Sequence, residues 1–353
     1  MAFNVRRRKQ DNILGICVIF IVSLTLWMLQ RPKQRFQFQK TNSNVDLVSE
    51  TDKCTLQMED KKILEQVVFK QEFPWEPNTS AVAQYRAELE RCCNTSFRLI
   101  LTKENITLRT NVNLWVEQDK LLEEAELKDL LPERSPFLGA HYRHCAVVGS
   151  GGILRNSRCG QEIDQADLVV RFNLPPMNFS EDVGTKTTLM TINPSIIMLR
   201  YKNLEFQRKP FVDALRSYRG ALFIMPAFSF VDRVDGAYRA LYTMKDFGLL
   251  QRFFILNPHY LNALTHYWKE KGLQPSRLSS GFVYVNIAFE FCQHVTLYGF
   301  WPFLYDLDSQ PILHHYYDHV MPMHKRHFMC CEFSRYLGMH AQGALRLQLG
   351  KCQ

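Results

Sequence analysis

From residue 144 onwards, short apolar runs alternate with stretches of helical periodicity, and no other feature constrains the fold as much. Residues 145–149, 168–172, 221–225, 252–256 and 295–300 are apolar runs of strand length. Residues 259–271 have the pattern of a helix, and residues 281–292 form an almost wholly apolar one. This alternation predicts an α/β domain with a mostly parallel central sheet. Ligands of such domains bind at the carboxyl ends of the strands.

The composition of the 353-residue chain is that of a folded protein. Hydrophobic residues make up 46% and aromatic residues 12%, which excludes a disordered chain and a fibrous repeat. The net charge of +8 favours anionic substrates, because a basic surface attracts anions. No recognised nucleic-acid-binding motif is present, so nucleic acid is not an expected partner.

The N-terminal region has the pattern of a membrane anchor. A basic cluster at residues 6–9 precedes an apolar run at residues 13–29, which as a helix would be about 26 Å long. A cleaved signal peptide is the alternative, but no small-x-small cleavage site follows. We therefore expect a cytoplasmic tail (1–12), a transmembrane signal anchor (13–29), a polar luminal stem (30–75) and a folded domain (76–353). Within these segments, residues 59–67 and 80–92 have the pattern of amphipathic helices.

Sequons and cysteines agree with a luminal body. Asn-x-Ser/Thr sequons predict glycosylation at Asn78, Asn94, Asn105 and Asn178. Nine of the ten cysteines follow the apolar run, which is typical of an oxidising compartment. Nine is an odd number, so at least one stays unbridged or joins a second copy in a homodimer. Spacing alone does not assign the pairs.

Two glycine- or serine-rich turns are candidate anion sites. Gly149-Ser150-Gly151-Gly152 directly follows a predicted strand, and its backbone N–H groups could approach a phosphate. Ser279-Ser280-Gly281 opens the apolar helix, where the helix N-terminus favours an anion. A tight turn and a helix cap are the respective structural alternatives.

A third candidate is the histidine-rich stretch 314–332, which holds five of the eleven histidines. Histidine suits a general base near neutral pH. His315 and His319 have the i,i+4 spacing of zinc ligands, but no recognisable third ligand follows. Asp306 and Asp308 form an Asp-x-Asp pair that could hold a metal on a nucleotide diphosphate, but such a pair is frequent by chance and a solvated loop is the favoured interpretation.

These segments together resemble the motifs of animal sialyltransferases. Residues 145–176 resemble the large sialyl motif, residues 275–303 the small motif, residues 314–318 the third motif, and His327 with Glu332 the very small motif, His-x4-Glu. The four motifs occur in the family's order over about 190 residues. The sequence Asn193-Pro-Ser-Ile and the run Tyr298-Gly-Phe-Trp-Pro-Phe303 are most similar to the α2,8 branch. Within this branch the chain resembles the members that add one or a few sialic acids.

The resemblance implies a single-pass type II Golgi membrane enzyme whose catalytic domain (76–353) is luminal. Its fold would be a Rossmann-like variant of the GT-A class. The enzyme would transfer sialic acid from CMP-sialic acid to a terminal sialic acid of a ganglioside or sialylated glycoprotein, with inversion and without a metal.

The resemblance also implies roles for individual residues. His327 would be the general base, and His315 would contact the donor phosphate. The CMP-sialic acid site would be lined by a set of small and polar residues with one tryptophan: Gly149, Ser150, Asn173, Ser279, Ser280, Gly281 and Trp301. The family's disulfides would fall on Cys145–Cys292 and Cys159–Cys352.

The chain departs from the family pattern at several positions. Ser150 and Ser280 stand where the family usually has Asn and Thr, and Cys330-Cys331 stands where a Pro is usual. Pairing of Cys330 or Cys331 with Cys92 or Cys93 is one interpretation of these cysteines. An alternative function is therefore a weakly active or inactive Golgi protein that binds a glycan or a partner transferase.

Overall fold

The computed structural model describes residues 64, 75–106, 124–227, 234–273, 277–306, 310–320 and 329–352. In this part of the chain one sheet has the strand order β5-β4-β3-β2-β1-β6-β7, and every neighbouring pair is parallel. The strands are β1 (Tyr142–Val148), β2 (Leu168–Phe172), β3 (Leu189–Thr191), β4 (Leu222–Met225), β5 (Phe253–Ile255), β6 (Cys292–Tyr298) and β7 (Arg346–Gln348). The predicted α/β class with a mostly parallel sheet is confirmed.

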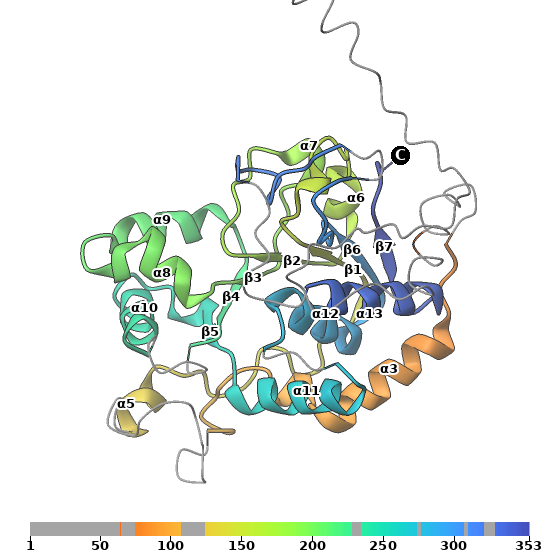
Figure 1. Ribbon diagram of the computed structural model, residues 1–353. Coiled ribbons are helices and arrows are strands. Elements are labelled where there is room, and N and C mark those ends of the chain that lie inside the picture. The colour runs from red at the N-terminus through yellow and green to blue at the C-terminus, as the bar shows by residue number, and fades with distance from the viewer. Residues whose placement is uncertain are drawn as a thin grey trace, which may run out of the picture. The chain divides into compact units, whose positions relative to one another are not determined.

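Helices cover both faces of this sheet (Figure 1). The α-helices are α3 (Thr79–Cys92), α4 (Thr95–Arg98), α5 (Glu124–Asp129), α6 (Gly160–Gln165), α7 (Ser180–Val183), α8 (Pro194–Arg200), α9 (Arg208–Ser217), α10 (Val234–Asp246), α11 (Pro258–Glu270), α12 (Ser280–Phe291) and α13 (Met329–Ala341). Short 3-10 turns are η2 (Gly152–Leu154), η3 (Lys202–Leu204) and η5 (Leu250–Arg252).

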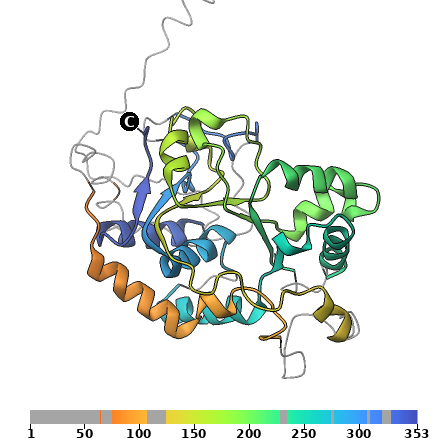
Figure 2. The same ribbon diagram turned by 180° about the vertical axis from the view of Figure 1, so that it is seen from behind.

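The alternation of side chains along the strands divides the core between the two faces. On one face α11, α12 and α13 pack against Val147, Val170 and Leu297. On the other face α6 and α7 cover Ala146 and Val169. Helices α8, α9 and α10 pack on strands β3 to β5, and Figure 2 shows α3 running beside α11 at the lower edge. Because both faces are covered, the strands are apolar runs rather than alternating ones.

Helix α12 lies against β1, β2 and β6 and is buried all round. Its sequence is apolar on every side, as a fully enclosed helix requires. Its one amide, Asn286, is satisfied by accepting from Trp268 Nε1 at 2.9 Å and donating to the Phe282 carbonyl at 2.7 Å. Strand β6 begins at Cys292, directly after the helix, so the start of α12 and the end of β6 lie at the same edge of the sheet.

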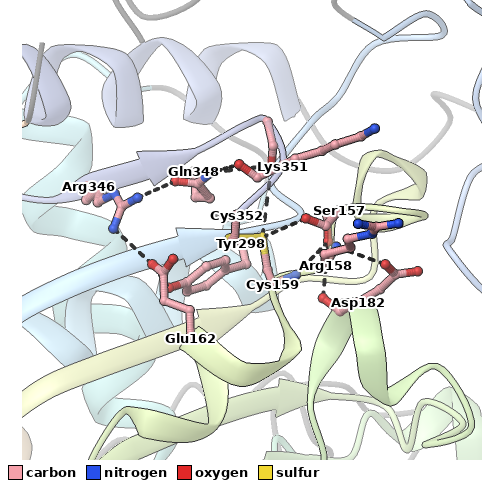
Figure 3. The surroundings of a disulfide bond; sticks show 11 residues. Ser157, Arg158, Cys159, Glu162, Asp182, Tyr298, Arg346, Gln348, Lys351 and Cys352 are labelled. Atoms are coloured by element: carbon pink, nitrogen blue, oxygen red, sulfur yellow. Dashed lines mark hydrogen bonds and ion pairs between the residues drawn. A yellow bond between two sulfur atoms is a disulfide. The ribbon is translucent and has the colours of Figure 1, made fainter. Parts of the chain in front are cut away.

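Two long-range disulfides tie the sheet together, and they are the pairs that the resemblance implies. Cys145 on β1 is bonded to Cys292 at the start of β6. Cys159 is bonded to Cys352, and the Cys352 N–H donates to the Ser157 carbonyl at 2.8 Å (Figure 3). The second bridge fixes the C-terminal strand beside the residues that follow β1.

The vicinal pair Cys92–Cys93 corrects one interpretation. These two cysteines are bonded to each other, so neither pairs with Cys330 or Cys331. Cys331 is itself disulfide-bonded, and Cys330 is buried.

Some predictions fall outside the described residues. The anchor (13–29) lies there, as do most of the predicted stem (30–75) and of the helix at 59–67. Among the helices that the structure describes, none has the length and apolarity needed to cross a membrane. The helices predicted at 80–92, 259–271 and 281–292 are present as α3, α11 and α12, each shifted by one residue or less at its ends.

Candidate active site

The strand order places a topological switch point at β1. From β1 the chain adds β2, β3, β4 and β5 on one side and returns later to add β6 and β7 on the other. Connections then leave neighbouring strands toward opposite sides, which opens a crevice at the carboxyl ends of β1 and β6. The segments predicted to bind a ligand lie at this edge.

The glycine loop after β1 is packed between two other backbone segments. The Gly149 N–H donates to the Tyr298 carbonyl at 2.8 Å, and the Gly151 N–H donates to the Gly299 carbonyl at 3.2 Å. A Cβ atom would lie 2.5 Å from Gly299 O at position 151 and 2.1 Å from Leu313 O at position 152. Glycine is therefore required for this close approach. Two of the N–H groups expected to hold a phosphate are used inside the protein.

The histidine-rich segment lies on the other side of this loop. His315 forms an antiparallel bridge with Gly151, and the Tyr316 N–H donates to the Ser150 carbonyl at 3.0 Å. Burial raises the pKa of Tyr317, and the nearby Ser150 side chain opposes that shift. Position 150, where the family usually has Asn, therefore contacts the third motif directly.

The imidazole of His315 is oriented by Asp318. Its Nδ1 is hydrogen-bonded to the Asp318 carboxylate, whose other oxygen accepts the His315 N–H at 3.2 Å. The Tyr317 ring stacks on the imidazole at 5.1 Å between centroids. Burial alone would raise the pKa of the Asp318 carboxyl. The hydrogen bonds from His315 together lower the pKa by more than burial raises it, so the pKa lies below its usual value. An ionised carboxylate thus holds Nδ1, and Nε2 is the ring nitrogen left for a ligand.

The first turn of α12 is held by a buried carboxylate. Ser279 caps the helix by accepting the Phe282 N–H at 3.1 Å. The Ser279 N–H and hydroxyl both donate to Glu332 of α13, the N–H at 2.7 Å. Burial raises the pKa of Glu332 to about 7, although the bonds from Ser279 oppose the shift. Glu332 therefore fixes the geometry of this helix end and titrates near neutral pH.

A chain of amide and hydroxyl contacts joins the same helix to β2 and β3. The Ser280 hydroxyl donates to Asn193 Oδ1 at 3.2 Å, and the Asn193 N–H donates to Asn173 Oδ1 at 3.0 Å. The Asn173 N–H donates to the Thr191 carbonyl at 2.8 Å. Asn173 has φ of 62° and Leu174 φ of 53°, which is a strained pair in the left-handed region. Asn193 was not among the predicted site residues, but it contacts two of them. Its position directly before Pro194, the first residue of α8, is the sequence signal of a helix cap.

The loop after β6 completes this edge. A Cβ atom on Gly281 would lie 2.9 Å from a ring carbon of Phe300, so this glycine allows the helix and the loop to pack closely. Trp301 is half-buried, and its Nε1 donates to the Tyr305 carbonyl at 2.7 Å. Its ring packs edge-on against Phe333 of α13.

The structure thus brings the predicted donor-site residues to one edge from several elements. Gly149 and Ser150 follow β1, Asn173 follows β2, and Trp301 follows β6, while Ser279, Ser280 and Gly281 open α12. His315 contacts the glycine loop. His327 lies outside the described residues, as does Asp308.

Of the Asp-x-Asp pair, the structure describes Asp306. Asp306 Oδ1 accepts the Gln310 N–H at 2.7 Å and its own N–H donates to the Gln310 carbonyl at 2.8 Å, as in a tight turn. No group of three His, Cys, Asp or Glu side chains with metal-binding geometry occurs among the described residues.

An all-parallel α/β domain with a polar cluster at its switch point is the architecture of nucleotide-using enzymes. The family model of glycosyltransferase family 29 (sialyltransferase) matches residues 95–344. The chain belongs to this family.

The chain is similar to named relatives and to a solved structure. The chain is 42% identical to alpha-N-acetylneuraminide alpha-2,8-sialyltransferase of Xenopus tropicalis, over 79% of this chain and 81% of the relative. It is 40% identical to alpha-2,8-sialyltransferase 8F of Homo sapiens, over 80% of this chain and 72% of the relative. The crystal structure of a mammalian sialyltransferase is 19% identical, covers 85% of this chain and 88% of its own, and has a TM-score of 0.44.

Proposed function

We propose that the protein is an α2,8-sialyltransferase. It transfers sialic acid from CMP-sialic acid to a hydroxyl of a terminal sialic acid on a ganglioside or sialylated glycoprotein. The observation that carries the proposal is a similarity to a relative whose name states this activity. The chain is 42% identical to it and covers 81% of that relative's length. The arrangement of the site supports it, because the motif residues from β1, β2, β6 and α12 share one edge of the sheet.

The proposed reaction is a single displacement at the anomeric carbon. The acceptor oxygen forms a bond to this carbon while the bond to the CMP oxygen breaks, so the configuration inverts. CMP leaves with the electron pair, and the general base takes the proton of the acceptor hydroxyl. His315 donates through Nε2 to the departing phosphate, and Asp318 on Nδ1 stabilises the positive charge of the donating ring.

His327 is the proposed general base. It precedes Met329, the first residue of α13, by two positions in the sequence. The first turn of α13 is bound to the donor-site helix through Glu332 and Ser279. The contact between Glu332, the second residue of the His-x4-Glu motif, and the donor-site helix supports the assignment of His327 as the base.

The proposed reaction needs no metal. The leaving group CMP carries a single phosphate. A nucleoside diphosphate leaving group carries more negative charge, which a metal ion would help to neutralise as it departs. The N-terminus of α12 and the imidazole of His315 supply positive potential for this phosphate.

The proposal includes a type II anchor at residues 13–29 with residues 76–353 in the Golgi lumen. The residues after the apolar run are charged and contain no small-x-small cleavage site, which supports an uncleaved anchor. The disulfides of the domain support an oxidising compartment.

A transfer assay on the full-length protein in detergent tests the function. The protein is incubated with CMP-sialic acid and a sialylated acceptor, with and without EDTA, and the product linkage is read by mass spectrometry after methylation. We expect a disialyl product in α2,8 linkage under both conditions, and His327→Ala should remove turnover while CMP binding persists. CMP binding without any transfer by the wild type would instead favour the non-catalytic binding protein.

A further inference from the structure

The loop after β2 is held from both sides by residues near the proposed site. Arg200, the last residue of α8, donates from Nη1 to the Leu174 carbonyl at 3.0 Å. The Tyr316 hydroxyl donates to the Pro176 carbonyl at 3.5 Å from the opposite side. Leu174 follows Asn173, which belongs to the proposed donor site. One short loop therefore separates the Arg200 guanidinium from the histidine-rich segment.

Arg200 has no acidic partner among the described residues. It is exposed, and one carbonyl bond engages only one of its five N–H groups. Two other arginines of this region differ, because the half-buried Arg208 is paired with an aspartate of α10 and the exposed Arg239 with a glutamate. The charge of Arg200 reaches the site: burial raises the pKa of Tyr317, and the coulombic effect of Arg200 opposes that shift.

The acceptor of the proposed reaction carries an anion on the same sugar whose hydroxyl attacks the anomeric carbon of the donor. A terminal sialic acid has a carboxylate on the same ring whose side chain bears the reacting hydroxyl. A carboxylate matches the planar fork of a guanidinium, which binds it through two parallel N–H···O bonds. A fixed cation at the rim of the site would orient that sugar and exclude neutral sugars.

We propose that Arg200 binds the carboxylate of the acceptor's terminal sialic acid and thereby sets the requirement for a sialylated acceptor. The proposal rests on the proposed function and adds a specificity-determining residue to it. The Nη1 bond to Leu174 sets the direction of the fork. The donor sugar carries a carboxylate too, so the test must separate the two substrates.

The experiment compares a soluble sialyl-lactoside with its N-methyl amide, in which the carboxylate is neutral. Full-length wild type and Arg200→Gln are assayed in detergent for kcat/KM on each acceptor at saturating CMP-sialic acid. Arg200→Lys keeps the charge without the fork. Arg216→Gln, on an exposed face of α9, is the matched control for loss of a surface arginine.

We expect the wild type to prefer the carboxylate acceptor by about 10- to 100-fold, the range of a hydrogen bond between charged groups. In Arg200→Gln this ratio should fall toward one, with the amide acceptor used as well as by the wild type. Arg200→Lys should be intermediate, and Arg216→Gln should match the wild type.

Three results would overturn the proposal. An unchanged ratio in Arg200→Gln would show that Arg200 does not read this carboxylate. An equal loss on both acceptors would show that the residue only holds the Leu174 loop. A raised KM for CMP-sialic acid with an unchanged acceptor ratio would assign Arg200 to the donor. If the wild type transfers to no sialylated acceptor, the proposed function itself fails, and this inference with it.

Discussion

Replacing Glu332 with Gln tests the buried contact that holds the start of α12. The side chain is 2% exposed and accepts both the N–H and the hydroxyl of Ser279. Gln has the shape of the protonated acid, since its carbonyl can accept the N–H and its amide can donate to the hydroxyl oxygen. The substitution therefore fixes the neutral state of this contact at every pH.

The sign and size of the effect follow from the pKa of Glu332. Burial raises it from 4.5 to about 7 in the folded protein. A raised folded pKa means that folding takes up a proton, so the stabilisation is full below pH 4.5 and is lost as the pH rises through 7. The shift corresponds to about 3 kcal/mol, at 1.36 kcal/mol per pKa unit.

Urea unfolding of wild type and Glu332→Gln at pH 5 and pH 8 measures this term. The two proteins should have similar free energies of unfolding at pH 5, and the wild type should lose about 3 kcal/mol relative to the variant by pH 8. The KM for CMP-sialic acid should rise over the same range in the wild type only, because an ionised Glu332 places negative charge at the helix N-terminus. Parallel pH profiles of the two proteins would refute the reasoning.

Three further predictions concern the hydrogen bonds and disulfides around the site. Asp318→Asn should lower kcat about tenfold or more with little change in CMP affinity, because the His315 ring loses the carboxylate that holds Nδ1; an unchanged kcat would contradict the role of this pair. The double variant Cys145→Ala with Cys292→Ala should lose about 2–5 kcal/mol of unfolding free energy, measured by thermal or urea unfolding, and a loss below 1 kcal/mol would show that the bridge is dispensable. Asn105 Nδ2 already donates to two backbone carbonyls at 2.8 and 2.9 Å, so we expect no glycan on this nitrogen. Asn105→Gln should therefore leave the gel mobility of the protein expressed through the secretory pathway unchanged, whereas the same change at each of the other three sequons should increase the mobility.

Local pattern predicted most of the strands and three of the long helices. Apolar runs bounded by turn residues predicted five of the strands, and the residue pattern predicted α3, α11 and α12 to within one residue at each end, whereas α9, α10 and α13 were not predicted. Strands β3 (Leu189–Thr191) and β7 (Arg346–Gln348) have three residues each and include polar ones, whereas β5, which is equally short, lies in the continuous apolar run 253–256 and was predicted. A run of that length has no measurable periodicity, and pairing with a neighbouring strand is what makes it a strand.

The candidate site was predictable as a set of residues but not as a set of contacts. The motif resemblance marked Gly149, Ser150 and His315, which the fold brings together. It could not show that the N–H groups of Gly149 and Gly151 donate to β6 and its loop, since that segment lies almost 150 residues further along the chain. The support that Asn193 gives to Ser280 likewise depends on β3, which the sequence did not reveal.

The contacts around α12 also decide which groups can hold a phosphate there. The Ser279 hydroxyl donates to the ionised Glu332 carboxylate, and the Ser280 hydroxyl donates to Asn193, so in this state neither has a proton left to donate to a phosphate. Their oxygens can only accept, for example from a ribose hydroxyl or an amino group. Among the described residues the N–H groups of Ser280 and Gly281 meet no acceptor, as expected for the first turn of a helix. A donor phosphate at this edge would therefore be bound by backbone N–H groups and His315, while the serine hydroxyls keep the helix end in place.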